Sequence, residues 1–92
     1  MKSIFKVVNC GDVYSVKSEK SESGMLDKRN LVLQEIGGKY EDQFVVSLLG
    51  NLASCQFYPD DIVYGVLRFQ VREHNQQNYQ DITVINLIKL NR

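Results

Sequence analysis

Basic and aromatic side chains recur together along this sequence, and they are the residues whose chemistry is easiest to state. Lysine and arginine pair with phosphate groups, and aromatic rings stack on nucleobases, each stack contributing roughly 1–3 kcal/mol. The candidates fall in two parts of the chain and are Lys17, Lys28, Arg29, Lys39, Tyr40, Phe44, Arg68, Arg72, His74 and Tyr79. This combination of side chains suits a single nucleic-acid strand as the ligand.

Acidic residues in the same parts of the chain leave a second interpretation open. The 11 lysines and arginines are balanced by 11 aspartates and glutamates, so no overall field attracts a polyanion. Between residues 17 and 39 the basic residues barely outnumber the acidic ones, as in an ordinary solvated loop. Arg68 and Arg72 can instead pair with acidic neighbours across a hairpin. His74 can equally be solvated at a hairpin tip, and Tyr79 can pack on the rim of the fold.

Other chemistries find little support in the sequence. With one histidine and no Cys-x-x-Cys pair, a metal site is not expected. The sequence contains no phosphate-binding glycine loop and no pattern of nucleophile, histidine and acid, so we expect neither an enzyme nor a small-molecule cofactor. Asp60 and Asp61 are adjacent carboxylates, but they follow Pro59, which indicates a turn.

The cysteines and the lack of long apolar runs predict where the protein works. Cys10 and Cys55 are the only cysteines, and free thiols are more expected than a single disulfide between them. The first residues lack the apolar segment of a signal peptide, and no run approaches the roughly 20 apolar residues that span a membrane. The sequence therefore predicts a cytoplasmic protein with no membrane partner.

The alternation of apolar and polar residues predicts the strands that would hold these side chains in place. One long strand is expected over residues 4–17, bent at Gly11, and a charged loop follows it. Two further strands, over residues 28–36 and 43–49, are joined by a turn at Gly37 and Gly38.

A short helix is expected after the third strand. Asn51 would cap the helix, and Pro59 would end it. Leu52 and either Cys55 or Gln56 would point inward.

The last two strands are expected over residues 61–71 and 81–90, with the polar stretch that starts at residue 72 as the hairpin tip between them. Strand alternation places Leu31 and Leu33 on one face of their strand. It likewise gives a common face to the third-strand residues Phe44, Val46 and Leu48. The remaining aromatic residues expected in the core or in a subunit contact are Phe5, Phe57, Tyr58, Tyr64 and Phe69.

The order of a bent strand, a hairpin, a short helix and a second hairpin is that of the OB-fold. The sequence thus predicts an all-β protein, a five-stranded Greek-key barrel with a short helix between strands three and four. Ninety-two residues, 43% of them hydrophobic, allow a single domain over residues 1–92. An SH3-like barrel and an open α+β sheet are the alternatives.

Part of the sequence resembles a known family. The stretch SLLGNLASCQFYPDDIVYGVLRFQVREHNQQNYQDITVINLIKL resembles the second half of bacterial single-stranded DNA-binding proteins, in which a strand ends at a glycine, a short helix follows, and a tyrosine leads the last strand. Gly50 and Tyr79 hold those places here. The chain is also similar to a shorter bacterial OB-fold family without an acidic tail. The matches are Gly11, Lys28-Arg29, Leu31-Val32-Leu33 and Tyr40 in the first half, and Arg72-Glu73 and Tyr79-Gln80-Asp81 in the later hairpin.

This resemblance implies sequence-nonspecific binding of single-stranded DNA in the groove of an OB-fold. Tyr40 and Phe44 would stack on bases, with His74 as a further candidate, because the chain has no tryptophan. The residues that would pair with phosphates are Lys28, Arg29, Lys39, Arg68 and Arg72. The sequence ends at KLNR, so recruitment of partners through an acidic tail is not expected.

The alternative function is an OB-fold protein-interaction or assembly module that binds no nucleic acid. Zero net charge, the absence of tryptophan, and the acidic residues Asp60, Asp61, Glu73 and Asp81 favour it. A continuous basic groove beside exposed aromatic rings would favour DNA, and a neutral or acidic groove would favour this alternative.

Apolar residues on both faces of the last two strands predict self-association. A small barrel buries one face of each strand, so the second set, among Tyr64, Val66, Ile85 and Leu87, needs another cover. A homodimer is the commonest solution, and a higher homo-oligomer is the alternative. The polar stretch 72–81 would then project from the barrel as a finger.

Overall fold

The computed structural model describes residues 1–18, 23–37 and 41–90 of the chain. Within these residues the chain forms six strands and one short 3-10 helix. They are β1 (Lys2–Cys10), β2 (Tyr14–Lys17), β3 (Met25–Glu35), β4 (Gln43–Leu49), η1 (Gly50–Ser54), β5 (Ile62–His74) and β6 (Gln77–Lys89).

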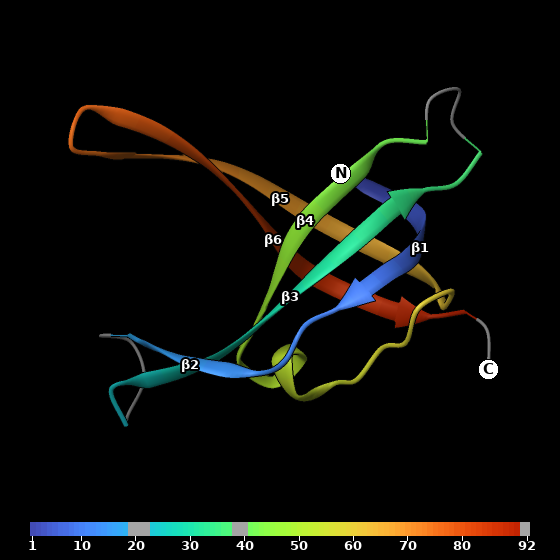
Figure 1. Cartoon of the computed structure of the whole chain (residues 1–92), viewed down its shortest axis with the longest axis horizontal. Coiled ribbons are helices and arrows are strands. Elements are labelled where there is room, and N and C mark those ends of the chain that lie inside the picture. The colour runs from blue at the N-terminus through green and yellow to red at the C-terminus, as the bar shows by residue number, and fades with distance from the viewer. Residues whose placement is uncertain (19–22, 38–40, 91–92) are drawn as a thin grey trace.

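The strands close into a barrel (Figure 1). Neighbouring strands follow the order β1-β5-β6-β4-β3-β2, and β1 also pairs with β3, which closes the sheet on itself. The pairing between β4 and β6 is parallel, and the others are antiparallel. When β1 and β2 are counted as one interrupted strand, this is the Greek-key order of a five-stranded OB-fold. The fold predicted from the sequence is confirmed.

The first predicted strand is broken in two at Gly11, where the sequence placed its bend. β1 ends at Cys10, and the chain resumes its pairing with β3 at Tyr14. In between, the Gly11 N–H donates to the Asn30 carbonyl oxygen at 2.9 Å, and a Cβ on Gly11 would lie only 3.1 Å from that oxygen. The missing side chain therefore lets the chain pass close to β3 while it changes direction.

Helix η1 is shorter than the sequence predicted. Leu49 holds the N-cap position, and no side chain caps the helix there. Asn51 lies within the helix, so its predicted capping role is wrong. Ala53 is buried and Leu52 packs against the core, whereas Cys55 and Gln56 are exposed rather than directed inward. Helices of the 3-10 type rarely continue beyond a few residues, and the backbone is extended again at Cys55.

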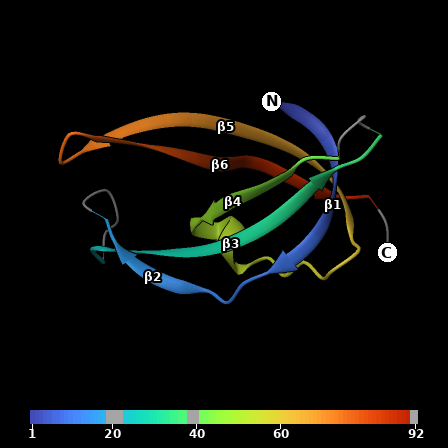
Figure 2. The ribbon, with the colours of Figure 1, turned by 45° about the horizontal axis from the view of Figure 1, so that its top comes forward.

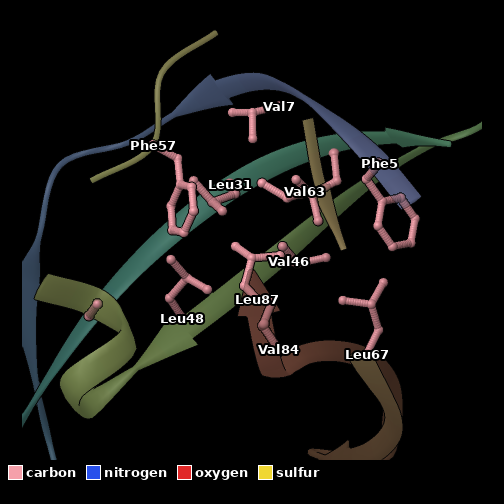
Figure 3. Close-up of a cluster of buried hydrophobic side chains, with 12 residues drawn as sticks. Phe5, Val7, Leu31, Val46, Leu48, Phe57, Val63, Leu67, Val84 and Leu87 are labelled. Atoms are coloured by element: carbon pink, nitrogen blue, oxygen red, sulfur yellow. The ribbon is translucent and has the colours of Figure 1, made fainter. Parts of the chain in front are cut away.

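Side chains from the strands, from η1 and from Phe57 fill the inside of the barrel (Figure 3). Twelve buried hydrophobic residues form it: Phe5, Val7, Leu31, Leu33, Val46, Leu48, Ala53, Phe57, Val63, Leu67, Val84 and Leu87. The predicted shared faces on β3 and β4 are confirmed by this set, with Phe44 half-buried at the edge of the same cluster.

A bulge on β6 corrects the predicted faces of the last strand. On β5, Val66 lies opposite Asn86, but the next residue, Leu67, lies opposite Val84. Ile85 is therefore an extra residue on β6, and such a bulge also increases the local right-handed twist.

The bulge makes Val84 and Leu87, three positions apart, both point into the barrel. Leu87, predicted on the outer face, is only 8% exposed. Ile88, which simple alternation would place on the same face as Val84, is 48% exposed. Simple alternation fails here because one inserted residue shifts the pattern by one position.

The polar stretch 72–81 is a continuation of two strands and not a loop. β5 runs to His74 and β6 starts at Gln77, so the turn consists of Asn75 and Gln76 alone. Both turn residues have positive φ, 52° and 64°, as a two-residue hairpin turn of type I′ requires. Residues 68–80 are all exposed, and Figures 1 and 2 show this part of the hairpin projecting away from the barrel. We call residues 68–81 the finger.

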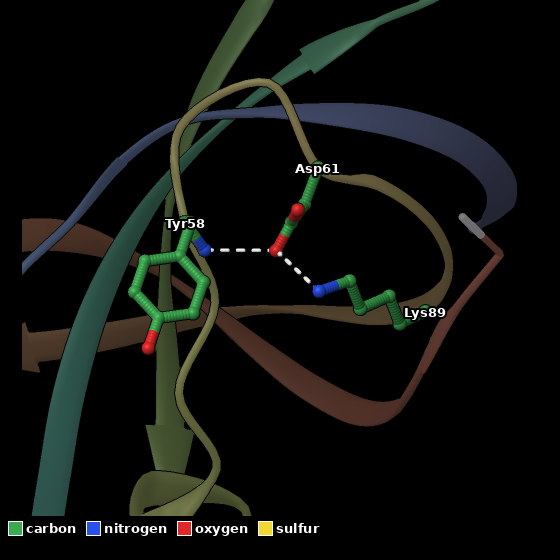
Figure 4. A network of polar contacts seen from close by, with 3 residues as sticks. All are labelled: Tyr58, Asp61 and Lys89. Carbon is green, nitrogen blue, oxygen red and sulfur yellow. Dashed lines mark hydrogen bonds and ion pairs between the residues drawn. The ribbon is translucent and has the colours of Figure 1, made fainter. Parts of the chain in front are cut away.

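The turn at Asp60 and Asp61, which the sequence predicted, is fastened to the last strand (Figure 4). The buried Asp61 carboxylate accepts a hydrogen bond from the Tyr58 N–H at 2.8 Å and pairs with Lys89 Nζ at 3.3 Å. The Lys89 ammonium group also lies 5.8 Å from the centre of the Tyr58 ring. This carboxylate is therefore occupied in joining the segment before β5 to the end of β6.

Candidate functional site

A groove lies where the outer face of β3 and β4 meets the finger. Its volume is about 280 Å³, and its lining residues are Lys28, Ser47, Leu49, Gln70, Arg72, Asp81 and Thr83. The groove is continuous across the two parts because Ser47 on β4 lies opposite Thr83 on β6 in the parallel pairing. Figure 2 shows the finger and the β2–β3 hairpin arm extending to the same side of the barrel.

A row of hydrogen-bonded polar side chains begins at Ser47 in the floor of the groove and continues across the outer face of the sheet. Leu31 and Val46 point into the core, so their strand neighbours Asn30 and Ser47 point outward. The Ser47 hydroxyl donates to Asn30 Oδ1 at 3.3 Å, and Asn30 Nδ2 donates to the Tyr14 hydroxyl at 3.2 Å. This row crosses β4, β3 and β2 and fixes the position of Tyr14, whose side chain is exposed.

The finger supplies the wall of the groove. Arg68, Gln70 and Arg72 share one face of β5, because the alternating residues between them belong to the other face. Arg72 Nε pairs with Asp81 Oδ2 at 3.2 Å, and its guanidinium carbon lies 5.6 Å from the centre of the Tyr79 ring. The wall therefore carries a cation, a carboxylate and an exposed aromatic ring in contact with one another.

The charge of the groove is mixed. Lys28 and Arg72 are the cations among its lining residues, and Asp81 is the carboxylate. The groove is therefore not continuously basic, and with two cations and one carboxylate it lies close to the neutral groove that would favour the assembly module. The positive excess is local and small.

The groove brings together some of the residues selected from the sequence. Lys28 and Arg72 line it, and Tyr79 lies beside Arg72. Arg68 is exposed on β5 opposite Thr83, which is itself a lining residue.

Other selected residues lie further away. His74 is exposed at the tip of the finger, and Lys17 is exposed at the end of β2. Lys17 lines a separate shallow cavity of the β2–β3 arm, together with Gly24 and Met25. Lys39 and Tyr40 lie outside the described residues.

Phe44 and Arg29 are not on the groove face. Phe44 packs edge-on between Phe5 and Phe69, with ring centres 6.2 Å and 6.3 Å apart, so its ring is engaged at the rim of the core. Arg29 Nη1 donates to the Cys55 carbonyl oxygen at 3.3 Å and to Cys10 Sγ at 3.5 Å. Both residues sit at strand positions of the inward-pointing series, which explains why neither reaches the groove.

Tyr14 is a site candidate that the first selection of residues left out. Its place beside Asn30 depends on how β2 pairs with β3 after the break at Gly11. That register follows from the folded path of the chain, so the sequence offered only the general signal of an aromatic residue between basic ones.

Comparisons with known proteins bear on the fold. No family model matches the chain, and no curated protein matches it. Among solved structures, it is similar to the solution NMR structure of the second OB-fold domain of replication protein A from Methanococcus maripaludis, with a TM-score of 0.69 and 15% identity over 99% of this chain and 83% of that chain.

Two further findings concern the described residues. No helix among them is long and apolar enough to cross a membrane. No group of three or more His, Cys, Asp or Glu side chains in the described ranges is arranged to hold a metal ion. From its strand order and its structural neighbour, the protein is an OB-fold domain.

Proposed function

We propose that the protein binds single-stranded DNA without sequence specificity, in the groove between the β3–β4 face and the finger. OB-folds bind oligonucleotides on this face and between the two loops that border it. The observation that carries the proposal is the presence of two exposed tyrosines, Tyr14 and Tyr79, on the same face as Lys28 and Arg72. Stacking surfaces beside cations are what a single strand requires.

The division of roles follows from the positions of these side chains. Lys28, Arg68 and Arg72 would pair with phosphates, and Tyr14 and Tyr79 would stack on bases. Lys17 and His74 lie near the ends of the β2–β3 arm and of the finger, where a longer strand would reach them. Lys39 and Tyr40 stay candidates on the sequence alone, whereas the contacts of Arg29 and Phe44 remove these two from the proposed site.

Binding should be modest and sensitive to salt. Each phosphate contact with a single strand adds about −0.7 to the slope of log affinity against log salt, so three contacts give a slope near −2. Fluorescence anisotropy with labelled oligo-dT at low and at moderate salt measures both quantities. Absence of binding at roughly micromolar protein in low salt would contradict the proposal. In this role the protein is a binding module and not an enzyme, and it works in the cytoplasm.

A second proposal, self-association, has a specific observation in its favour. On the outer face of the barrel, Ile4, Tyr64 and Ile88 lie in register across β1, β5 and β6, and Ile36 is hydrogen-bonded through its N–H to the Ile4 carbonyl oxygen at 3.4 Å. Ile4 and Ile36 are each 44% exposed, and Leu90 is 54% exposed.

This outer apolar row is the surface that a second copy of the chain would cover. Isolated exposed apolar residues are common, but a row across adjacent strands forms a contiguous patch. A twofold dimer is the simplest arrangement that covers it in both copies. Such a dimer is compatible with DNA binding, because the outer apolar row and the lining of the groove have no residue in common. Without DNA binding, the same row supports the alternative function as an assembly module.

A further inference from the structure

We propose that Asp81 acts as an intramolecular substitute for a DNA phosphate on Arg72 and thereby sets the affinity of the groove. The proposal rests on the function proposed above and adds a residue that lowers affinity. It is carried by the ion pair between Arg72 and Asp81, which lies in the lining of the groove itself.

The position of Asp81 follows from the hairpin register. Gln70 lies opposite Asp81, and Arg72 lies opposite Tyr79, so Asp81 and Arg72 are diagonal neighbours on one face of the finger. Arg72 Nε lies 3.2 Å from Asp81 Oδ2. A carboxylate oxygen carries negative charge and accepts hydrogen bonds from a guanidinium group, as a phosphate oxygen does.

The ring of Tyr79 is involved in the same contact. The Arg72 guanidinium carbon lies 5.6 Å from the ring centre, which is cation–π distance. Arg72 therefore covers one face of Tyr79 while its charge is directed to Asp81. An incoming strand must draw Arg72 away from Asp81 or stack a base on the exposed side of its guanidinium plane.

The pair is weak enough to be exchanged. The Arg72 and Asp81 side chains are 64% and 47% exposed, so water screens their attraction. When a phosphate takes Arg72, Asp81 is left without its counter-charge beside another negative group. Asp81 thus reduces affinity twice, first by competing for the arginine and then by repelling the phosphate.

The pair is not needed to hold the hairpin together. Strand pairing continues without interruption from Leu67 opposite Val84 to His74 opposite Gln77, on both sides of the ion pair. Removing the carboxylate therefore leaves the backbone of the finger in place. An effect of removing the Asp81 carboxylate on DNA binding can therefore be measured separately from any effect on folding.

The test compares Asp81→Asn with Glu73→Gln in oligo-dT anisotropy at low salt. Glu73 is also exposed on the finger, but it belongs to the opposite face, so its variant loses the same charge away from the groove. Asp81→Asn should tighten binding roughly three- to tenfold and steepen the salt dependence. Glu73→Gln should change the affinity by less than about twofold.

A double-mutant cycle with Arg72→Gln shows whether the effect passes through the arginine. If Asp81 competes for Arg72, the gain from Asp81→Asn should shrink to about twofold or less in the Arg72→Gln background. An equal gain in both backgrounds, or an equal gain from Glu73→Gln, overturns the proposal. Asp81→Ser serves as a second variant, and thermal unfolding checks that each variant is folded.

The outcomes separate this inference from the function on which it rests. If the wild-type protein binds oligo-dT and Asp81→Asn binds equally well, only the role of Asp81 is overturned. If only Asp81→Asn binds, the role of Asp81 in lowering affinity is supported, and DNA binding by the wild-type protein is overturned. If no variant binds at micromolar concentration and low salt, DNA binding is overturned, and the role of Asp81 with it.

Discussion

Ser47 on β4 and Thr83 on β6 lie opposite each other in the parallel pairing that joins the floor of the groove to the finger. Both side chains line the groove. Because paired residues on neighbouring strands present their side chains on the same face of a sheet, the outward face of β4 continues directly into one face of the hairpin. Residues that are about 40 to 50 positions apart in sequence, such as Lys28 and Arg72, thereby line one surface.

The first prediction concerns this surface. Lys28→Gln should weaken binding of oligo-dT by roughly three- to tenfold at low salt and reduce the salt slope by about 0.7, because one phosphate contact is lost. Lys2→Gln is the matched control, since Lys2 is exposed on the outer face of β1 and away from the groove. Anisotropy titrations at several salt concentrations give both numbers. An equal loss in the two variants would point to general electrostatics.

The second prediction concerns stacking. Tyr14→Ala and Tyr79→Ala should each lower the affinity by about five- to a hundredfold, corresponding to roughly 1–3 kcal/mol per stacked base. Tyr58→Ala is the control, because Tyr58 is 55% exposed but lies beside Lys89, whereas Tyr14 is paired with Lys28 and Tyr79 lies beside Arg72. The chain has no tryptophan, so quenching of tyrosine fluorescence by oligo-dT provides an independent signal. If Tyr14→Ala and Tyr79→Ala both bind oligo-dT with wild-type affinity, the proposed stacking on these two rings is contradicted.

The third prediction concerns assembly. Sedimentation velocity of the wild-type protein at micromolar concentrations should show a dimer, and Ile88→Glu should convert it to a monomer by placing a charge in the outer apolar row. Val71→Glu is the control, since Val71 is 74% exposed but lies on the finger. A monomeric wild-type protein across the concentration range would show that the outer apolar row has no self-association role.

The fourth prediction concerns the hairpin turn. Gln76 has a φ of 64°, which costs a residue with a side chain about 1 kcal/mol relative to glycine. Gln76→Gly should therefore raise the free energy of unfolding by roughly 0.5–1 kcal/mol and create the Asn-Gly pair that type I′ turns favour. Gln77→Gly, one residue into β6, should lower it, because glycine weakens a strand. Urea denaturation compares the two variants, and stabilisation by both would contradict the turn assignment.

The fold could be predicted because its main determinants are local. Alternating apolar residues mark the inward faces of β3 and β4, and Gly11 marks the bend after β1. The break in the first strand and the short η1 helix differ from the predicted elements only in where each element begins and ends. The extra residue at Ile85 could not be predicted, because an inserted residue is indistinguishable from ordinary alternation until its partner strand is known.

The candidate site was only partly predictable for a similar reason. Residue type alone selected Arg29 and Phe44, although their strand positions belong to the inward series of Leu31 and Val46. The face of the strand on which each position lies, taken together with side-chain type, excludes both residues from the candidate site. Pairing across the break in the first strand, which places Tyr14 opposite Lys28, depends on tertiary structure and has no local signal.

The bulge at Ile85 has a consequence for how this protein can change during evolution. Ile85 and Asn86 together occupy the place opposite a single residue of β5, so the strand faces on either side of the bulge stay in phase. Loss of one codon, that of Ile85, would leave every core and groove side chain pointing as it does now and would reduce only the local twist. The twist at the base of the finger can therefore be adjusted by a single deletion, without any substitution among the residues that pack the barrel or line the groove.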